Sequence, residues 1–286
     1  MLYSAFCVKS TNAIRETRAG LMSDIDLTFA GPLARVRLDS PARRNAMSRT
    51  MWLALPRICA AIGARADALV VVVEGAGGDF CAGADIQEFA EVYRDAAAAH
   101  DYVNAIQDGL MALAALDRPT IAALTGAAVG GGLGLALCCD LRFCADDAML
   151  AITPAKLGLL YGHVETRRLV ELVGPACAKD LLFSGRRIAP AEALAIGLVD
   201  RVAPAHELAG AVAAYCTVLA GLSQRSIRGA KRAVDAIARG MPAESRAFRE
   251  AVEDAAMGED FREGRAAFTE KRAPGFTFRG RTDAVD

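Results

Sequence analysis

Two glycine-rich segments are the first places where this sequence could do chemistry. Residues 75–86 read GAGGDFCAGADI, and residues 130–132 are three consecutive glycines. Each segment follows an apolar run and precedes a helix-like pattern, so backbone N–H groups are left without helical acceptors and open to a ligand. Two such donors that converge on one oxygen would form an oxyanion hole. Tight turns in a packed core also need glycine for backbone reasons alone, so the spacing leaves both interpretations open.

Neither glycine segment matches a nucleotide-binding motif. Phe80 stands where a dinucleotide fingerprint has its third glycine, and no ribose-binding acid follows a clear second strand. A P-loop is excluded because no glycine–lysine–Ser/Thr sequence occurs in either segment.

Titratable side chains near the second half of the chain offer acid–base chemistry. His163 and Glu165 are two residues apart and could share the rim of a pocket if they lie in a turn. We favour a simpler role for Glu165, which is to stabilise the start of a helix over 166–174 through the helix dipole. His163 is either an exposed turn residue or a catalytic group, because histidine titrates near neutral pH. We interpret Asp85 as the cap of the helix that follows it.

The elements that would position these residues alternate between strand and helix. The sequence predicts a hairpin over 24–38, a helix from Ser48 to Ala64 and a strand at 69–75. A helix is expected to start at Asp85, and an alanine-rich helix follows it and ends at about Leu116. Further strands are expected at 120–124 and 141–145, which together indicate an α/β architecture. Only helical patterns follow residue 203. We therefore divide the chain into an N-terminal extension at 1–21, an α/β core at 22–203 and a helical C-terminal region at 204–286.

Composition excludes several classes of protein. The 286 residues are 53% hydrophobic and carry a formal net charge of −1, so binding to nucleic acid or to an anionic membrane surface is not expected. Eight cysteines lack any C-x-x-C pair and three histidines lie far apart, so we expect no metal site and a reducing, cytoplasmic location. Residues 121–139 are uncharged over nearly the length of a membrane span, but five glycines favour a buried strand, turn and helix.

Several ordered motifs make the sequence recognisable. They lie at 43–47 (RRNAM), 80–86 (FCAGADI), 118–132 (RPTIAALTGAAVGGG), 139–142 (CDLR), 154–159 (PAKLGL), 195–200 (AIGLVD) and 268–272 (FTEKR). In this order and at these distances the chain resembles the crotonase (enoyl-CoA hydratase/isomerase) superfamily over nearly all of residues 24–280.

The resemblance implies a fold, a substrate and an assembly. The fold is a crotonase-like spiral of ββα turns with a helical C-terminal region that drives formation of a homotrimer, or of a hexamer built as a dimer of trimers. The substrate is a CoA thioester, with no other cofactor, no metal and no nucleic-acid or membrane partner. By motif match, the backbone N–H groups of Ala82 and Gly131 hold the thioester oxygen.

The same resemblance assigns a CoA-binding set. Arg43 or Arg44 and Lys271 are placed where the family contacts CoA phosphates, although each is equally compatible with an ordinary solvated surface charge. The remaining expected contacts are Ala84, Asp85, Ile86 and Phe268.

The chain departs from the hydratase pattern at both catalytic glutamates. The first glutamate follows the glycine triplet by two residues, and Gly134 stands there. The second is replaced by Pro154. The segment from Thr153 to Tyr161 instead resembles methylmalonyl-CoA decarboxylase, in which the matching threonine and tyrosine line the reacting end of the acyl group. Ala84 departs from that enzyme, which has histidine there.

We therefore expect an acyl-CoA lyase in which an oxyanion hole stabilises a thioester enolate. Decarboxylation of a malonyl-type CoA is favoured, since a nearby glutamate would repel the substrate carboxylate. Thr153, Tyr161 and His163 are the candidate side chains. The alternatives are a divergent hydratase or isomerase that uses other residues, and a non-catalytic acyl-CoA-binding protein.

Overall fold

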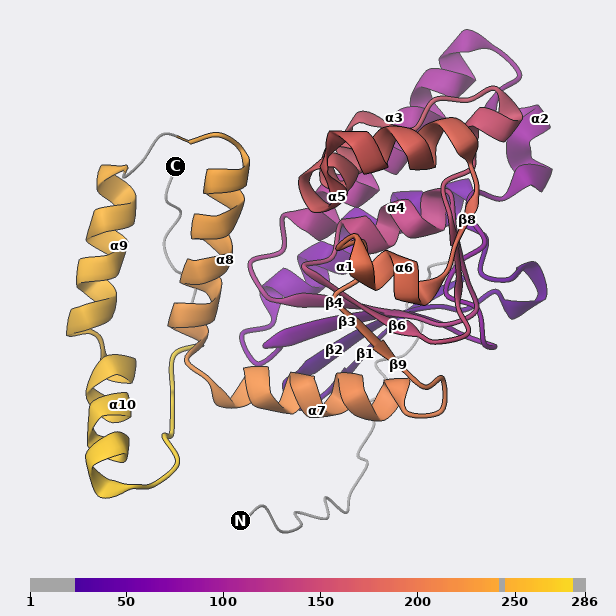
Figure 1. The fold of residues 1–286 in the computed structure, drawn as a ribbon. Coiled ribbons are helices and arrows are strands. Elements are labelled where there is room, and N and C mark those ends of the chain that lie inside the picture. Colours follow the sequence, from indigo (N-terminus) through magenta and orange to yellow (C-terminus); the bar gives the residue numbers. More distant parts are fainter. Residues whose placement is uncertain (1–23, 242–244, 280–286) are drawn as a thin grey trace.

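A computed structural model describes residues 24–241 and 245–279, and the expected extension at 1–21 lies outside them. The chain builds a six-stranded sheet, a smaller three-stranded sheet and ten α-helices within the described residues. Figure 1 shows the larger sheet at the centre, with helices on both of its faces.

The larger sheet begins as the predicted hairpin and continues in parallel. Its order is β1 (Ile25–Ala30), β2 (Leu33–Leu38), β3 (Val70–Gly75), β4 (Thr120–Leu124), β6 (Leu141–Ala145) and β9 (Arg201–Ala203). Only β1 and β2 are antiparallel. The four valines of β3 are all buried, as expected for a strand covered on both faces.

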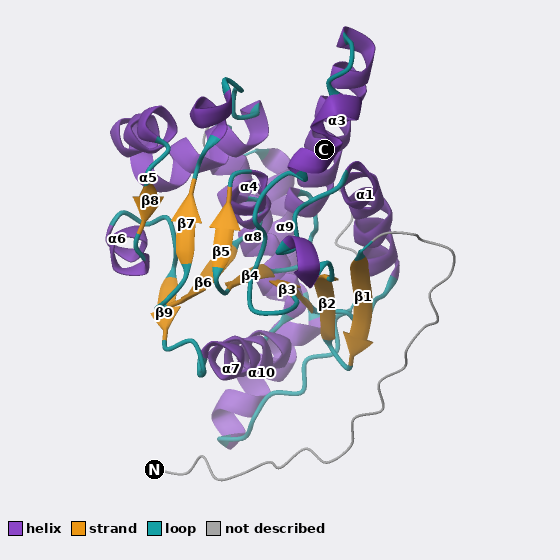
Figure 2. Ribbon diagram, turned by 90° about the vertical axis from the view of Figure 1, so that its right-hand side faces the viewer, coloured by secondary structure: helices purple, strands orange, loops and turns teal. Residues whose placement is uncertain are grey.

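The smaller sheet holds β5 (Ala127–Val129), β7 (Met149–Ala151) and β8 (Arg187–Ile188). It lies beside the larger sheet in Figure 2. An isolated bridge between Cys81 and Ala128 joins it to the first glycine segment. This pairing brings the two glycine segments together, although about fifty residues separate them in the sequence.

Helices on one face of the larger sheet carry the residues of interest. They are α1 (Arg49–Ala64), α3 (Ala96–Ala114), α4 (Gly131–Leu137), α5 (His163–Ser184) and α6 (Pro190–Ala195). Ser48 caps α1 by accepting from the Met51 N–H at 3.3 Å, as its residue type predicts. Short 3-10 turns are η1 (Pro41–Arg43) and η3 (Pro154–Leu157).

The helix expected to start at Asp85 consists of two short pieces, and the alanine-rich helix follows them as a separate element. Asp85 caps a 3-10 turn, η2 (Ile86–Glu88), which leads into α2 (Phe89–Val92). The long helix α3 then starts afresh, because Asp95 accepts from the Ala98 N–H at 2.8 Å and supplies a new N-cap.

The C-terminal helices follow β9, which ends at Ala203. The first, α7 (Leu208–Gly221), covers the opposite face of the sheet and buries Leu208, Val212 and Cys216 in the core. The others, α8 (Gln224–Ala238), α9 (Arg246–Met257) and α10 (Glu259–Glu270), form a separate layer at the left of Figure 1. These features confirm the predicted α/β core with a helical C-terminal region.

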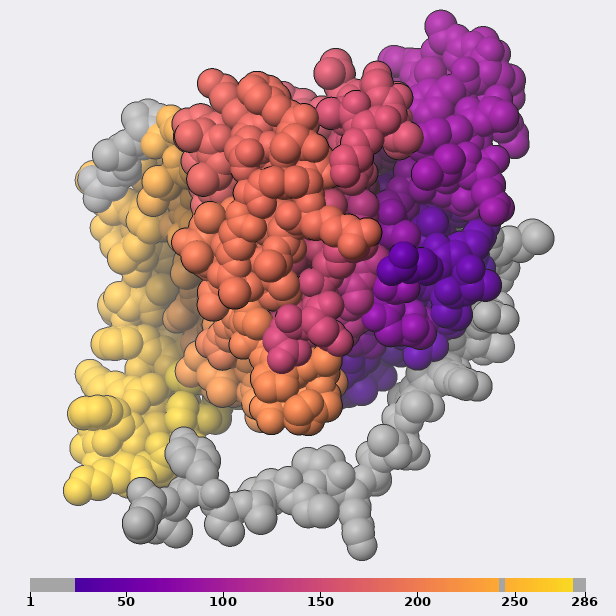
Figure 3. All heavy atoms as spheres, turned by 45° about the vertical axis from the view of Figure 1, so that its right-hand side comes forward, coloured from indigo at the N-terminus to yellow at the C-terminus, as the bar shows by residue number. Residues whose placement is uncertain are grey.

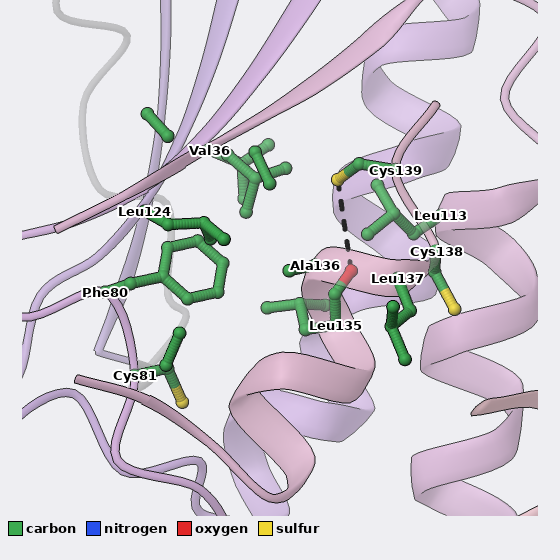
Figure 4. Close-up of a cluster of buried hydrophobic side chains, with 14 of the residues drawn as sticks. Val36, Phe80, Cys81, Leu113, Leu124, Leu135, Ala136, Leu137, Cys138 and Cys139 are labelled. Carbon is green, nitrogen blue, oxygen red and sulfur yellow. Dashed lines mark hydrogen bonds between the residues drawn. The ribbon is translucent and has the colours of Figure 1, made fainter. Parts of the chain in front are cut away.

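The second glycine segment is anchored in the core by α4. Figure 4 shows Leu135 and Leu137 of this helix among buried side chains that include Phe80 and Leu124. All of its residues after Gly131 are buried. Residues 121–139 thus hold most of β4, the short strand β5 and the helix α4, which is one strand more than the sequence predicted. Among the described residues, no helix has the length and apolar character needed to cross a membrane.

Candidate active site

A cavity of about 180 Å³ lies where the two glycine segments meet α3 and α5. One wall consists of residues 82–84 and 130–131, with Trp52 behind them. The other contains Gln107 of α3 and the segment from Thr153 to Glu165. Aromatic and aliphatic side chains close the rest of the cavity: Ile86, Phe89, Tyr93, Tyr102, Val103, Ile106, Leu157, Leu159 and Leu160. An apolar cavity with few polar groups is typical of a small-molecule site.

The first glycine segment corrects our assignment of one backbone donor. The Ala82 N–H donates to the carbonyl oxygen of Arg44 at 2.9 Å, so it is not available to a ligand. Within the described residues, the Ala84 N–H donates no intramolecular hydrogen bond. Ala84 is half-buried and lines the cavity. The donor from this segment is therefore the amide of Ala84 rather than that of Ala82.

Gly83 lies between Ala82 and Ala84 and allows the Ala84 amide to turn toward the cavity. Its φ of +113° lies in a region that favours glycine, and a Cβ there would come 3.0 Å from the carbonyl oxygen of Val129. The same Cβ would be 3.8 Å from the Gly131 nitrogen, so the two glycine segments are in direct contact.

The second segment presents the amide of Gly131 at the cavity. Gly131 is the first residue of α4, so its N–H has no helical acceptor, and it lines the cavity. A Cβ on Gly131 would lie 3.7 Å from the Ala84 nitrogen and 3.3 Å from Cζ2 of Trp52. Two N–H groups at neighbouring points of one wall can hold a single developing oxyanion.

Gly134 leaves a space that the opposite wall fills. A Cβ on Gly134 would lie 2.8 Å from Cγ of Glu165 and 3.0 Å from the hydroxyl oxygen of Tyr161. This is the position at which the resemblance expects the first hydratase glutamate. A carboxylate therefore approaches the same region of the cavity, but it comes from α5 and not from α4.

Glu165 has a different environment from the one we expected. Helix α5 starts at His163 rather than at 166, and Glu165 is only 4% exposed and lines the cavity. It accepts a hydrogen bond from Nε2 of Gln107 at 3.0 Å. The interpretation of Glu165 as only a dipole-stabilising residue was therefore incomplete. Sequence analysis missed Gln107 entirely, because 58 residues separate it from Glu165 and no local pattern connects them.

The two residues of the decarboxylase-like segment both reach the cavity. Thr153 lines it, with its hydroxyl 3.5 Å from where a Cβ on Gly130 would lie. The Tyr161 hydroxyl donates to the Gly130 carbonyl oxygen at 3.0 Å. Burial, together with the nearby Glu165 carboxylate, raises the pKa of the Tyr161 hydroxyl well above its usual value. Tyr161 is thus a neutral donor that is already engaged with the backbone.

His163 lies outside the cavity. It is exposed at the first position of α5 and is not part of the cavity wall. This geometry agrees with an exposed residue at a helix start and not with a catalytic histidine in this cavity.

The arginines near the first glycine segment are held by carboxylates. Arg43 pairs with Asp24 and with Asp85, at 2.9 Å for the latter. Arg44 donates to both carboxylate oxygens of Asp79, at 2.8 and 3.0 Å. Asp85 also accepts from the Gln87 N–H at 3.1 Å and so caps η2, as predicted.

The remaining expected CoA contacts separate into two groups. Ile86 is 63% exposed and lines the cavity. Phe268, which is 86% exposed, and Lys271 lie at the end of α10. In Figures 1 and 3 this layer lies on the opposite side of the molecule from α2 and α3. One chain therefore does not bring Phe268 and Lys271 to its own cavity.

Comparisons with known proteins identify the family of this chain. The profile of the enoyl-CoA hydratase/isomerase family matches residues 28–279. The human enoyl-CoA hydratase domain-containing protein 2, mitochondrial, is 36% identical over 263 residues, which cover 87% of each chain. A solved structure of an enoyl-CoA hydratase/carnithine racemase from Magnetospirillum magneticum has a TM-score of 0.86 at 33% identity and covers 90% of this chain and 96% of its own.

A second solved structure, an enoyl-CoA hydratase from Bacillus anthracis, has a TM-score of 0.81 at 31% identity. It covers 89% of this chain and 99% of its own. Since the family match extends over most of the sequence and the fold is shared, the chain belongs to the enoyl-CoA hydratase/isomerase family, the crotonase superfamily recognised from its motifs.

Proposed function

We propose that this protein is an acyl-CoA enzyme whose reaction passes through a thioester enolate. The observation that carries the proposal is the pair of amides, Ala84 and Gly131, directed at one cavity from adjacent turns. When charge develops on the thioester oxygen, these two preorganised donors stabilise it without the cost of reorienting water. Removing one such donor typically costs about 10²–10³-fold in rate.

Decarboxylation of a malonyl-type CoA is one candidate reaction for this site. Thr153 and Tyr161 both line the cavity, and neither Gly134 nor Pro154 supplies a carboxylate. Two contacts weigh against it. The Tyr161 hydroxyl is already bound to the Gly130 carbonyl, and the Glu165 carboxylate would repel the carboxylate of the substrate. Proton transfer at carbon, as in a divergent hydratase or isomerase, therefore fits the cavity better.

A thioester screen tests the proposal. Purified protein is incubated in deuterated buffer with 2-enoyl-, 3-enoyl-, malonyl- and methylmalonyl-CoA, and the products are followed by mass spectrometry. Incorporation of solvent deuterium or gain of water supports proton transfer at carbon, while loss of CO₂ supports decarboxylation. Binding of these thioesters without any turnover would identify a non-catalytic acyl-CoA-binding protein and refute the proposal.

We also propose a homotrimer or a dimer of trimers. Apolar side chains lie exposed along the C-terminal layer, among them Ile237 at 72%, Val252 at 53% and Phe261 at 53%. Because α10 is remote from the cavity of its own chain, Phe268 and Lys271 can contact CoA only in the cavity of a second copy. Light scattering coupled to size exclusion measures the assembly.

The cytoplasmic location stays a prediction, and the human relative carries "mitochondrial" in its name.

A further inference from the structure

Glu165 combines burial with the absence of a cationic partner. Its side chain is nearly inaccessible, and the only hydrogen-bond donor to it among the described residues is the neutral amide of Gln107. The nearby arginines of α5, Arg167 and Arg168, pair with Glu171 instead. A buried carboxylate that lacks an ion pair is costly for stability.

Gln107 holds this carboxylate in one orientation. Its Oε1 accepts from the Val164 N–H at 3.4 Å, so its Nε2 is directed at Glu165, where it donates to Oε2 at 3.0 Å. Both contacts come from the first turn of α5. Gln107 therefore connects α3 to the helix start that carries the carboxylate and fixes the position of Oε2.

Two glycines leave the space that Glu165 occupies. Besides the contact at Gly134, a Cβ on Gly162 would overlap Oε2 of Glu165 and Nε2 of Gln107, and would lie 3.0 Å from Cδ of Glu165. Side chains at 134 and 162 would each displace the carboxylate. A glutamate at position 134 and one at position 165 are thus mutually exclusive occupants of this part of the cavity.

The carboxylate approaches α4 near Gly134, beyond the amide of Gly131 along the same helix. Gly134 is three residues after Gly131 on α4, which corresponds to about 4.5 Å along a helix axis. Glu165 approaches the Gly134 end of this turn, while the Gly131 amide faces the thioester oxygen. A substrate whose oxygen is bound at Ala84 and Gly131 would place its α-carbon between the oxyanion site and the carboxylate.

We propose that Glu165 is the catalytic acid–base residue of this site and that Gln107 is its positioning residue, an inference that rests on the proposed function. The Glu165 carboxylate removes a proton from the α-carbon of the acyl-CoA. The C–H electron pair becomes the C=C bond of the enolate, and the charge moves to the thioester oxygen at Ala84 and Gly131. The protonated Glu165 then returns the proton to carbon. The substrate class is an acyl-CoA with an acidic α-hydrogen, not a malonyl-type thioester.

The first test measures exchange of α-hydrogen for solvent deuterium in a 3-enoyl-CoA. We expect Glu165→Gln to slow exchange by about 10²–10⁴-fold, the usual worth of general acid–base assistance. Acyl-CoA affinity, measured by calorimetry, should be retained.

Glu171→Gln is the matched control, because Glu171 lies on the same helix, outside the cavity. Exchange at the wild-type rate in Glu165→Gln would overturn the inference. Glu165→Asp covers the case in which Glu165→Gln does not fold. It keeps the charge but withdraws the carboxylate by one methylene, so exchange should slow, and exchange at the wild-type rate would overturn the inference.

The second test separates positioning from structural support. Gln107→Leu should lower kcat about tenfold and leave KM within about threefold, because a misplaced base affects the transition state more than the bound ground state. In the Glu165→Gln background, Gln107→Leu should have no further effect on turnover. Equal effects of Gln107→Leu in both backgrounds would exclude a role through Glu165.

The third test moves the carboxylate across the cavity. Glu165→Gly abolishes exchange, and Gly134→Glu in the same chain should restore at least part of it by supplying a carboxylate from α4. No recovery in a folded double variant that still binds acyl-CoA would contradict the shared position. The two hypotheses fail differently: loss of exchange in Gly131→Val without loss in Glu165→Gln refutes only the role of Glu165, while absence of any wild-type exchange, hydration or decarboxylation refutes the enolate function itself.

Discussion

The two walls of the cavity use different parts of the polypeptide. The wall formed by the glycine segments presents backbone amides at Ala84 and Gly131 and has almost no functional side chains. The wall formed by α3 and α5 presents side chains, namely Gln107, Tyr161 and Glu165. Backbone donors are set by the local path of the chain, whereas the side-chain wall depends on how two helices pack. The first wall can be recognised from sequence, and the second requires the structure.

The largest expected effect on turnover comes from blocking access to the two backbone amides of the glycine wall. In Gly131→Val, a branched side chain enters a site where even a Cβ would be 3.3 Å from Trp52 and 3.7 Å from the Ala84 nitrogen. The thioester oxygen can then no longer approach both amides. We expect turnover to fall by at least about 10²-fold, measured as α-deuterium exchange. Gly210→Val, on α7, has open space around its Cβ and controls for loss of a helical glycine.

Displacing the Glu165 carboxylate on the other wall should have a smaller effect on turnover. Gly134→Ala adds a methyl group 2.8 Å from Cγ of Glu165, so the carboxylate must shift while the amides stay in place. We expect turnover to fall about tenfold and acyl-CoA affinity to change by less than about threefold, as for an interaction made only in the transition state. Equal losses in affinity and turnover would show that Gly134 supports binding rather than the orientation of Glu165.

Tyr161 connects the two walls through a hydrogen bond, so its substitution tests the stability of the fold rather than the rate of the reaction. Its hydroxyl donates to the Gly130 carbonyl, which also accepts from the Gly134 N–H at 3.0 Å, so Tyr161→Phe removes one of the two hydrogen bonds to this oxygen. The lost hydrogen bond predicts a decrease of about 0.5–1.5 kcal/mol in the free energy of unfolding. Urea denaturation monitored by circular dichroism measures this loss, and an unchanged midpoint would show that the hydrogen bond adds nothing to stability.

The sequence predicted those features that depend on local pattern. The hairpin, the buried valine strand, the Ser48 cap and the Gly131 amide all follow from residue types within a few positions. The identity of the other donor was wrong by two residues, because the hydrogen bond between Ala82 and Arg44 comes from a loop almost forty residues earlier. Pairing across the chain decides which amide of a turn stays free, and the turn sequence itself does not contain this information.

Glu165 shows the limit of sequence analysis most clearly. The absence of a glutamate at Gly134 was visible in the sequence, but the residue that fills the space was not. Its position depends on α5 starting at His163, on the glycine at 162, and on Gln107 of α3. None of these contacts is local to Gly134. The helix-dipole interpretation of Glu165 suits an exposed helix start. It does not account for a carboxylate that is buried against α3 and bound by Gln107.

The smallest expected effect concerns the attachment of the glycine segments to each other. Asp79 accepts from Arg44, and its Oδ1 accepts from the Ala127 N–H at 2.7 Å, so it ties the first segment to β5. The Arg44 hydrogen bonds, opposed by partial burial and helped by the Ala127 amide, hold the pKa of Asp79 below its ordinary value. A lowered carboxyl pKa stabilises the fold above the unfolded pKa of about 3.9, and this contribution is lost as pH falls through the folded pKa.

We expect Asp79→Asn to lower the free energy of unfolding by about 1–2 kcal/mol at pH 7, with the difference from wild type shrinking below about pH 4. Denaturation series at pH 7 and pH 3 measure it, and a difference that is constant across this range would show that the charge of Asp79 is not what holds the two segments together.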